Sequence, residues 1–330
     1  MVWSAFRVMS VCLVLLSFTV SSYSQDLMAK PKPTSTSKQN ILDLFNQAPM
    51  PSGPVHEAFA TSLQLNPVPV PVAPKAPPVS VNEMPNANRP AGENVQWIDG
   101  YWVYDGKAER FLWVSGLWRK LPPGRQWTPT KWQKVDGGFR RIAGSWLPDD
   151  MKDEQIVKLE ELPKSLEKGP EVAKPQEDAF WVPGSWEKES DVVAQADAPA
   201  KIKTDGPAEI VDTPKPMAKV ERNGEYVWNS GMWSQSYDDW IWVPAHYVWT
   251  PSGNRRVEGY WDYPWSIRGR LNACCGEPTP NYVPQPLNTE DRYTNLWTDT
   301  ATGNYYYGDY ANRGYENLVP WHQYHVQNVG

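Results

Sequence analysis

The chain has 330 residues, of which 33 are proline and 19 are tryptophan, with 21% charged residues and a formal net charge of −6. This much proline indicates folded segments separated by extended linkers rather than two continuously folded domains. The mildly acidic balance gives no general support for a nucleic-acid-binding protein, and we expect no nucleic acid among its partners.

The N-terminus has the pattern of a secretory signal peptide. Arg7 precedes the apolar run Val8–Val20, and Ser22 and Ser24 place small residues where a signal peptidase reads the chain. We therefore predict that residues 1–24 are removed after Ser24 and that the protein is exported to the periplasm, the cell envelope or the extracellular space. An uncleaved anchor is the alternative, but the run is short for a membrane span of about 20 residues. We expect no transmembrane span in the mature chain.

Residues 25–94 are dominated by Pro, Ala, Val, Ser and Asn. Proline fixes φ and has no N–H to donate, so such a run favours polyproline II over the interior of a sheet. We predict a disordered, Pro-rich spacer over this range.

Residues 95–149 form a first repeat block. A six-residue motif with Trp at both ends begins at Trp97, Trp113 and Trp127, and an Arg-led version begins at Arg141. The last three starts are fourteen residues apart, with Gly and Pro turn signals between them. Because this period fits one strand plus one turn, the block is predicted to be an antiparallel β-meander.

The same series returns with starts at Trp228, Trp242 and Arg256, which indicates an internal duplication. The isolated copy Trp181–Trp186 resembles the missing fourth member, so we expect Phe180–Trp186 to pair with this second block. The predicted all-β chain then has a charged linker over 150–179, a second block over 180–265 with a disordered insertion at 187–223, and a Tyr-rich β-extension over 266–330. Thr302–Asn304, between aromatic runs, predicts a hairpin turn.

Glycine occupies the fourth position of most copies. Residues five apart in a regular strand point to opposite faces, so the two Trp side chains would lie on opposite sides of the sheet. The glycine would then let a ring from a neighbouring strand lie over the backbone. Alternatively it marks a bulge that brings both indoles to one face. The spacing does not distinguish these two arrangements.

Most of the tryptophans are expected to form the core of a small sheet, since each buries roughly 150–250 Å². A subset that stays exposed could serve as flat platforms for sugars or peptides. The second Trp of each copy is the best candidate for ligand binding, which selects Trp102, Trp118, Trp132, Trp146, Trp186, Trp233 and Trp261. The first block is also locally basic and could attract anionic envelope polymers, unless the acidic linkers neutralise it in cis.

Catalytic motifs are not found. The sequence has no phosphate-binding loop, nucleophile elbow or metalloprotease helix, so we predict no catalytic residues, no cofactor and no enzyme. His322 and His325 are spaced to face opposite ways on a strand, which disfavours a metal site. Cys274 and Cys275 remain after the signal peptide, and they could form a vicinal disulfide, an intermolecular disulfide or two free thiols.

The W-x-x-G-x-W copies at Trp113–Trp118, Trp181–Trp186 and Trp228–Trp233, with the turn Pro122–Arg125 and the segment Trp127–Pro129, resemble the WXXGXW (YXWGXW) repeat family of exported bacterial proteins. The resemblance covers about one third of the chain. Because that family has no established activity, the resemblance implies location and repeat architecture rather than a ligand.

We therefore expect a non-enzymatic protein with a structural or interaction role in the bacterial cell envelope. Its expected partners are envelope proteins, polysaccharides or further copies of itself. The alternative is a carbohydrate- or envelope-polymer-binding module that uses exposed Trp platforms.

Overall fold

The computed structural model of the protein describes residues 49–50, 52–151, 158–159, 162–188, 221–237, 239–275, 278–287, 295–308, 310 and 317–321. All of these belong to one compact unit, Leu42–Gly330. The predicted signal peptide, His322, His325 and most of the predicted insertion at 187–223 lie outside the described residues.

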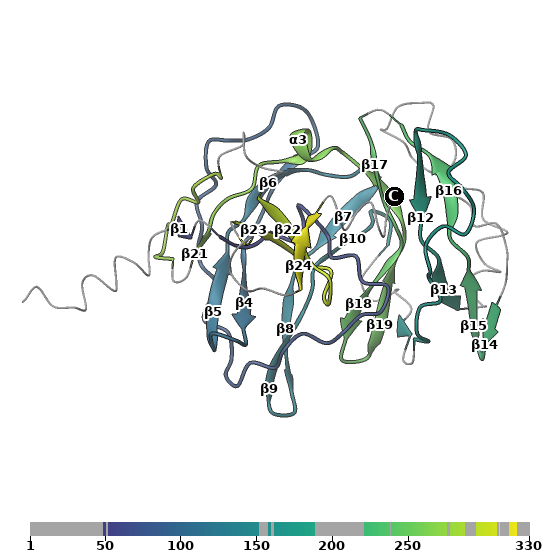
Figure 1. Ribbon diagram of the computed structural model, residues 1–330. Helices are drawn as coiled ribbons and strands as arrows, with labels where there is room; N and C mark the ends of the chain where they lie inside the picture. Colours follow the sequence, from purple (N-terminus) through teal and green to yellow (C-terminus); the bar gives the residue numbers. More distant parts are fainter. Residues whose placement is uncertain are drawn as a thin grey trace, which may run out of the picture. The chain divides into compact units, whose positions relative to one another are not determined.

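The described chain is nearly all β, as predicted, and its repeats form four hairpins with two motifs each (Figure 1). The first hairpin contains β3 (Val95–Ile98), β4 (Tyr101–Asp105), β5 (Arg110–Val114) and β6 (Leu117–Lys120). The second contains β7 (Arg125–Thr128), β8 (Lys131–Val135), β9 (Gly138–Ile142) and β10 (Ser145–Pro148). The third contains β12 (Ala179–Val182), β13 (Ser185–Lys188), β15 (Tyr226–Asn229) and β16 (Met232–Gln235), with β14 (Glu221–Asn223) at its edge. The fourth contains β17 (Ile241–Val243), β18 (His246–Thr250), β19 (Gly253–Val257) and β20 (Tyr260–Asp262).

Each motif is a corner at which a strand ends and a second strand starts in a new direction. In the first hairpin β4 pairs with β5 on one side of the corner, and β3 pairs with β6 on the other. The same two antiparallel pairings occur in the second, third and fourth hairpins. One bent strand and one turn therefore account for the repeat period. The isolated motif Trp181–Trp186 pairs with Trp228–Trp233, so the third hairpin closes across the insertion.

The hairpins contact one another in the order first, second, fourth, third, which can be followed in Figure 1. Trp132 of the second hairpin donates to the Trp102 carbonyl of the first at 3.2 Å. Arg255 of the fourth donates to the Ala143 carbonyl of the second at 3.3 Å.

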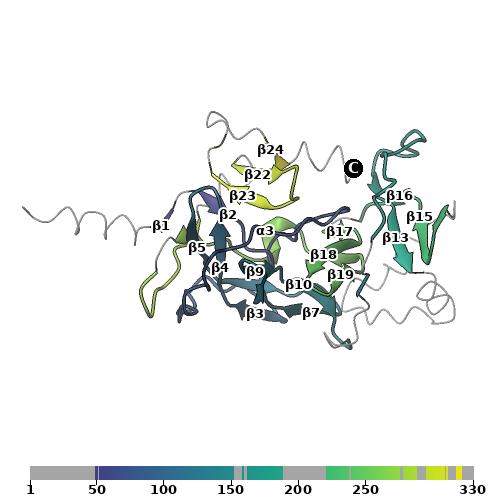
Figure 2. The ribbon, with the colours of Figure 1, turned by 90° about the horizontal axis from the view of Figure 1, so that it is seen from below.

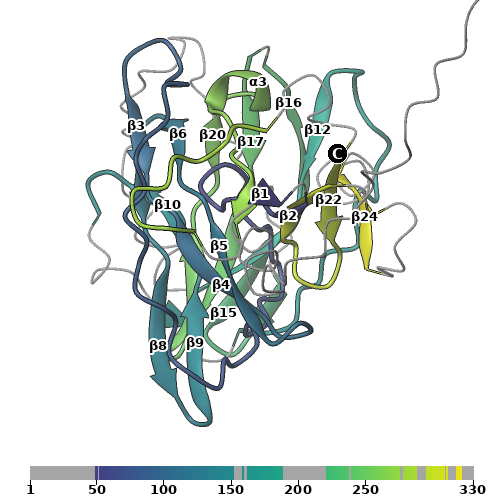
Figure 3. The same ribbon diagram turned by 90° about the vertical axis from the view of Figure 1, so that its left-hand side faces the viewer.

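The C-terminal strands do not extend the second block. β21 (Cys274–Cys275) pairs with β5 of the first hairpin and with β1 (Pro49–Met50). β2 (Gly53–Pro54), β23 (Tyr305–Tyr307), β22 (Leu296–Asp299) and β24 (Leu318–Pro320) form a sheet in that order. The turn predicted at Thr302–Asn304 joins β22 to β23. The single helical turn α3 (Trp265–Arg268) lies between this sheet and the strands β3 and β7 in Figure 2, and Figure 3 shows β3 and this sheet on opposite sides of α3. β11 (Lys158–Leu159) pairs with β19.

The core includes a segment that was predicted to be spacer. Ala58 and Phe59 are at most 1% exposed and pack with Leu117, Trp146 and Val257. The expectation of a spacer over 25–94 therefore fails for this segment. Five apolar residues, Val55, Ala58, Phe59, Ala60 and Leu63, bury this segment, although the proline content nearby favours an exposed spacer.

Candidate functional site

The two motifs of a hairpin face each other, first position against sixth. In the first hairpin Trp97 is opposite Trp118 and Trp102 is opposite Trp113. Their ring centroids are 5.6 and 5.2 Å apart, with interplanar angles of 76° and 69°. Such edge-to-face pairs are favourable because the positive edge of one ring meets the negative face of the other. The third hairpin also has two aromatic pairs at these positions. The second and fourth hairpins have one each, because an arginine replaces the Trp of the other pair.

The motif glycine is required for close approach. A Cβ on Gly100 would lie 2.7 Å from Cζ2 of Trp113, and one on Gly184 would lie 2.6 Å from Cζ2 of Trp228. Gly144, Gly231 and Gly259 are approached by a Trp ring in the same way. None of these glycines adopts a positive φ. The ring over the backbone is thus the arrangement that occurs at these corners.

Three hairpins hold at their corner a glutamate from a segment outside the repeats. Glu83 accepts from the Trp113 indole and from the Gly116 amide, both at 2.7 Å. Glu167 accepts from the Trp181 indole at 3.1 Å and also from the Gly184 amide. In each case the first residue of a motif and its glycine bind the two carboxylate oxygens of one side chain.

The second hairpin repeats this arrangement with an arginine. Arg141 at the first motif position donates to Glu57 Oε1 at 2.5 Å, while the Gly144 amide donates to Oε2 at 3.0 Å. Thr130 donates to the same Oε2 at 3.1 Å. The copy led by Arg141 therefore binds a strap glutamate in the same way as the Trp-led copies, whereas Arg256 pairs with Glu187 of β13.

The segments that carry these glutamates, called straps below, comprise residues 55–63, 77–89 and 164–172. Their backbone carbonyls accept indole N–H groups from the sixth motif positions. Trp102 donates to Val79 at 3.1 Å and Trp118 to Asn86 at 2.7 Å. Trp186 and Trp233 donate in the same way to Lys164 at 3.0 Å and to Val172 at 2.9 Å. Burial raises the pKa of Glu83, although the Trp113 indole partly opposes this.

The duplication is preserved in the contacts between hairpins. Trp132 donates to the Trp102 carbonyl in the first block, and its counterpart Tyr247 donates to the Trp186 carbonyl at 2.5 Å in the second. Arg256, the counterpart of Arg141, pairs with a glutamate of the third hairpin, Glu187.

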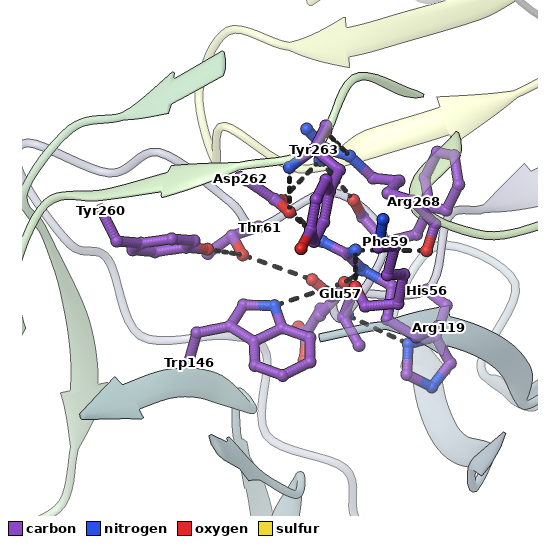
Figure 4. A network of polar contacts seen from close by, with 12 residues as sticks. His56, Glu57, Phe59, Thr61, Arg119, Trp146, Tyr260, Asp262, Tyr263 and Arg268 are labelled. Atoms are coloured by element: carbon purple, nitrogen blue, oxygen red, sulfur yellow. Dashed lines mark hydrogen bonds and ion pairs between the residues drawn. The ribbon is translucent and has the colours of Figure 1, made fainter. Parts of the chain in front are cut away.

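A buried polar network joins the first hairpin to the fourth (Figure 4). Arg119 binds both carboxylate oxygens of Asp262 at 2.7 and 2.6 Å, and Arg268 lies 3.1 Å from the same carboxylate. The backbone carbonyls of Ala58 and Phe59 accept from these two arginines at 2.8 Å each. Burial lowers the pKa of Arg268 to about 10, opposed by Asp262. This network is fully enclosed, so it fixes the strap 55–63 rather than forming a site for a ligand.

A cavity lies between the first and second hairpins. This cavity, called the Trp groove below, has a volume of about 450 Å³. Its walls are Trp97, Trp102, Trp127 and Trp132, together with Pro77 and Pro78 of a strap. Gln96, Asp99 and Thr130 add polar groups to the lining. Pockets that bind small ligands typically measure about 300–1,000 Å³ and combine apolar walls with a few polar groups, as this one does.

The seven predicted platform residues have different environments. Trp146, Trp186 and Trp102 are buried, at 0%, 3% and 7% exposure. Trp118, Trp132, Trp233 and Trp261 are half-buried. Only Trp102 and Trp132 come together, in the Trp groove.

Trp97 and Trp127, at first motif positions, also line the groove, although they are not among the seven predicted platform residues. Both remain half-buried. Their position could have been inferred from the repeat, because two paired motifs place the first position of one opposite the sixth position of the other. Residues at both positions therefore lie on the same surface of the hairpin.

The remaining predicted sites can be placed in part. Cys274 is buried and its Sγ donates to the Trp113 carbonyl at 3.2 Å, while the side chain of Cys275 is outside the described set, so the disulfide stays a prediction. Among the described residues no group of three or more His, Cys, Asp and Glu side chains is arranged to hold a metal. Within the same residues no helix is long and apolar enough to span a membrane.

Comparison with known proteins returned no matching family model, no similar curated protein and no similar solved structure.

Proposed function

We propose that this is an exported, non-enzymatic WXXGXW-type repeat protein with a structural and protein-interaction role in the bacterial cell envelope, and that its hairpins act by holding extended peptide segments. The observation that carries the proposal is the recurrence of one arrangement at Glu83, Glu57 and Glu167. In each, a strap glutamate is bound by a corner glycine amide and by the first side chain of a motif.

The chemistry of this arrangement is that of peptide recognition. The hairpin supplies N–H donors and aromatic rings, and the strap supplies backbone carbonyls and one carboxylate. Any extended segment with a suitably placed glutamate offers the same acceptors. A hydrogen bond to a charged group contributes about 1.5–3 kcal/mol, so the glutamate gives the hairpin a side-chain preference that backbone carbonyls alone would not.

Export is supported by the sequence. Arg7 and the apolar run Val8–Val20 have the composition of a signal peptide, and the motif copies resemble a family of exported bacterial proteins. An envelope location would bring the repeats into contact with other exported polypeptides and with polysaccharides. The carbohydrate-binding alternative stays a prediction and is tested below together with the Trp groove.

The test is to supply a strap in trans. In a mature chain of residues 25–330, residues 77–89 are replaced by a Gly–Ser linker of equal length, and far-UV circular dichroism checks that the sheets remain. A synthetic peptide with the sequence of residues 77–89 is then titrated while Trp fluorescence is recorded. The matched control peptide carries Glu83→Gln.

We expect the natural strap peptide to bind at least about 10-fold more tightly than the Glu83→Gln peptide, because the charge-assisted bonds contribute about 1.5–3 kcal/mol. Equal affinity of the two peptides, or no binding of either one to a folded variant, would contradict the proposal.

A further inference from the structure

We propose that the Trp groove binds a proline-rich segment of another polypeptide, in polyproline II conformation and with a basic residue beside the prolines. The inference deepens the proposed function, since it assigns to one surface of the first block the kind of partner that the straps represent in cis.

The duplication shows that this surface is open in the first block and covered in the second. Trp97, Trp127 and Trp132 are half-buried. Their counterparts Trp181, Trp242 and Tyr247 are only 8%, 9% and 3% exposed. The same three motif positions are thus buried in the second block, whereas in the first block they are partly exposed and line a cavity.

A strap contributes to the covering in the second block. The indole of Trp181 donates to Glu167 of the strap 164–172. The indole nitrogen of its counterpart Trp97 has no hydrogen-bond partner among the described residues, so no strap carboxylate is bound there.

The occupant is indicated by what already packs beside the groove. Pro77 and Pro78 form one of its walls, and the next residue of the same strap, Val79, accepts the Trp102 indole N–H through its carbonyl. The Trp102 indole therefore already holds a proline-containing extended segment beside the groove. Polyproline II has no internal hydrogen bonds and presents its carbonyls to such donors, and little conformational entropy is lost when it docks.

Charge selects the flanking residue. Asp99 is exposed and lines the groove, and its carboxylate gives the opening a negative charge. A Lys or Arg next to the prolines would lie close to it. Such a rim pair contributes about 0.2–1 kcal/mol and acts on selectivity more than on affinity.

The experiment uses the full mature chain, residues 25–330, in isothermal titration. The probes are a ten-residue oligoproline ending in Arg, the same peptide ending in Glu, a Gly–Ser peptide ending in Arg, and oligosaccharides of N-acetylglucosamine and glucose. Gln96→Trp is the blocking variant, because Gln96 is exposed and lines the groove. Gln133→Trp is the matched control, an exposed glutamine on β8 that is not part of the lining.

We expect the Arg-ended oligoproline to bind, and to bind about 2- to 5-fold more tightly than the Glu-ended peptide, as the rim pair implies. Gln96→Trp should weaken binding at least about 10-fold and Gln133→Trp less than 2-fold. Asp99→Lys should invert the preference between the two charged peptides.

Three results would each overturn the inference: no oligoproline binding at 1 mM peptide, equal binding of the Gly–Ser peptide, or binding of a sugar that Gln96→Trp abolishes. The strap experiment above depends on Glu83, which is not among the residues that line the groove. Its success alongside a failure here would therefore refute the groove proposal and leave the proposed function standing.

Discussion

Replacing a corner glycine with alanine tests whether ring approach is what the motif requires. Gly144 is the best position, since a Cβ there would lie 2.8 Å from Cη2 of Trp127, closer still to Cζ2, and 2.9 Å from the Thr128 carbonyl oxygen. The Trp127 ring packs against Trp146, which is fully buried, and the two ring centroids are 5.0 Å apart. The ring must therefore shift against a packed neighbour.

The size of the effect follows from two opposing contributions. Forcing an extra carbon into a close-packed site costs about 1–3 kcal/mol. Alanine also restricts the unfolded chain, and this stabilises the folded state by about 0.4–1 kcal/mol. We therefore expect Gly144→Ala to lower the free energy of unfolding by about 1–2 kcal/mol.

Urea denaturation of the mature chain, followed by far-UV circular dichroism, measures this difference. Gly106→Ala is the matched control, because its Cβ would lie an ordinary 3.4 Å from Pro71, and we expect a change of less than about 0.5 kcal/mol. In a Trp127→Ala background the part of the cost that comes from the ring should disappear, which gives a coupling energy of about 1 kcal/mol, while the contact with the Thr128 carbonyl oxygen remains. A cost that is undiminished without the Trp127 ring would refute the reasoning.

Acidification and a buried charge give two further predictions. Burial lowers the pKa of His56 and His246 to about 4. Each histidine therefore contributes stability that is present above pH 6.5 and is lost as the pH falls toward 4. At about 1.4 kcal/mol per pKa unit, the loss is roughly 3 kcal/mol for each histidine. Burial raises the pKa of Glu83 and Glu187, and their protonation in the folded state opposes part of this loss. A free energy of unfolding that does not fall between pH 7 and pH 5 would contradict the prediction. Asp262→Asn leaves Arg119 and Arg268, the two buried arginines of Figure 4, without their counter-charge. We expect it to lower the free energy of unfolding by about 3–5 kcal/mol in urea denaturation. A decrease below about 1 kcal/mol would show that the strap carbonyls alone stabilise the two arginines.

The sequence by itself determined the repeat and its secondary structure. The spacing of Trp, Gly and Pro is local information, and it predicted strands, turns and the all-β class. Trp181–Trp186 could be assigned to the second block for the same reason, because a motif that needs a partner copy stood alone beside three others.

Only the tertiary structure decided which partner each motif has and what covers it. Whether the glycine marks a bulge or lies beneath a ring depends on the opposite strand, which fourteen-residue periodicity does not specify. The roles of Glu57, Glu83 and Glu167 could not be predicted, because each lies outside the motif that binds it and is linked to it only through folding. The same holds for the platforms: Trp146 and Trp132 occupy the same motif position, yet one is enclosed by a strap and the other lines an open groove. Exposure depends on which distant segment packs on a ring, and that is a property of the assembled chain.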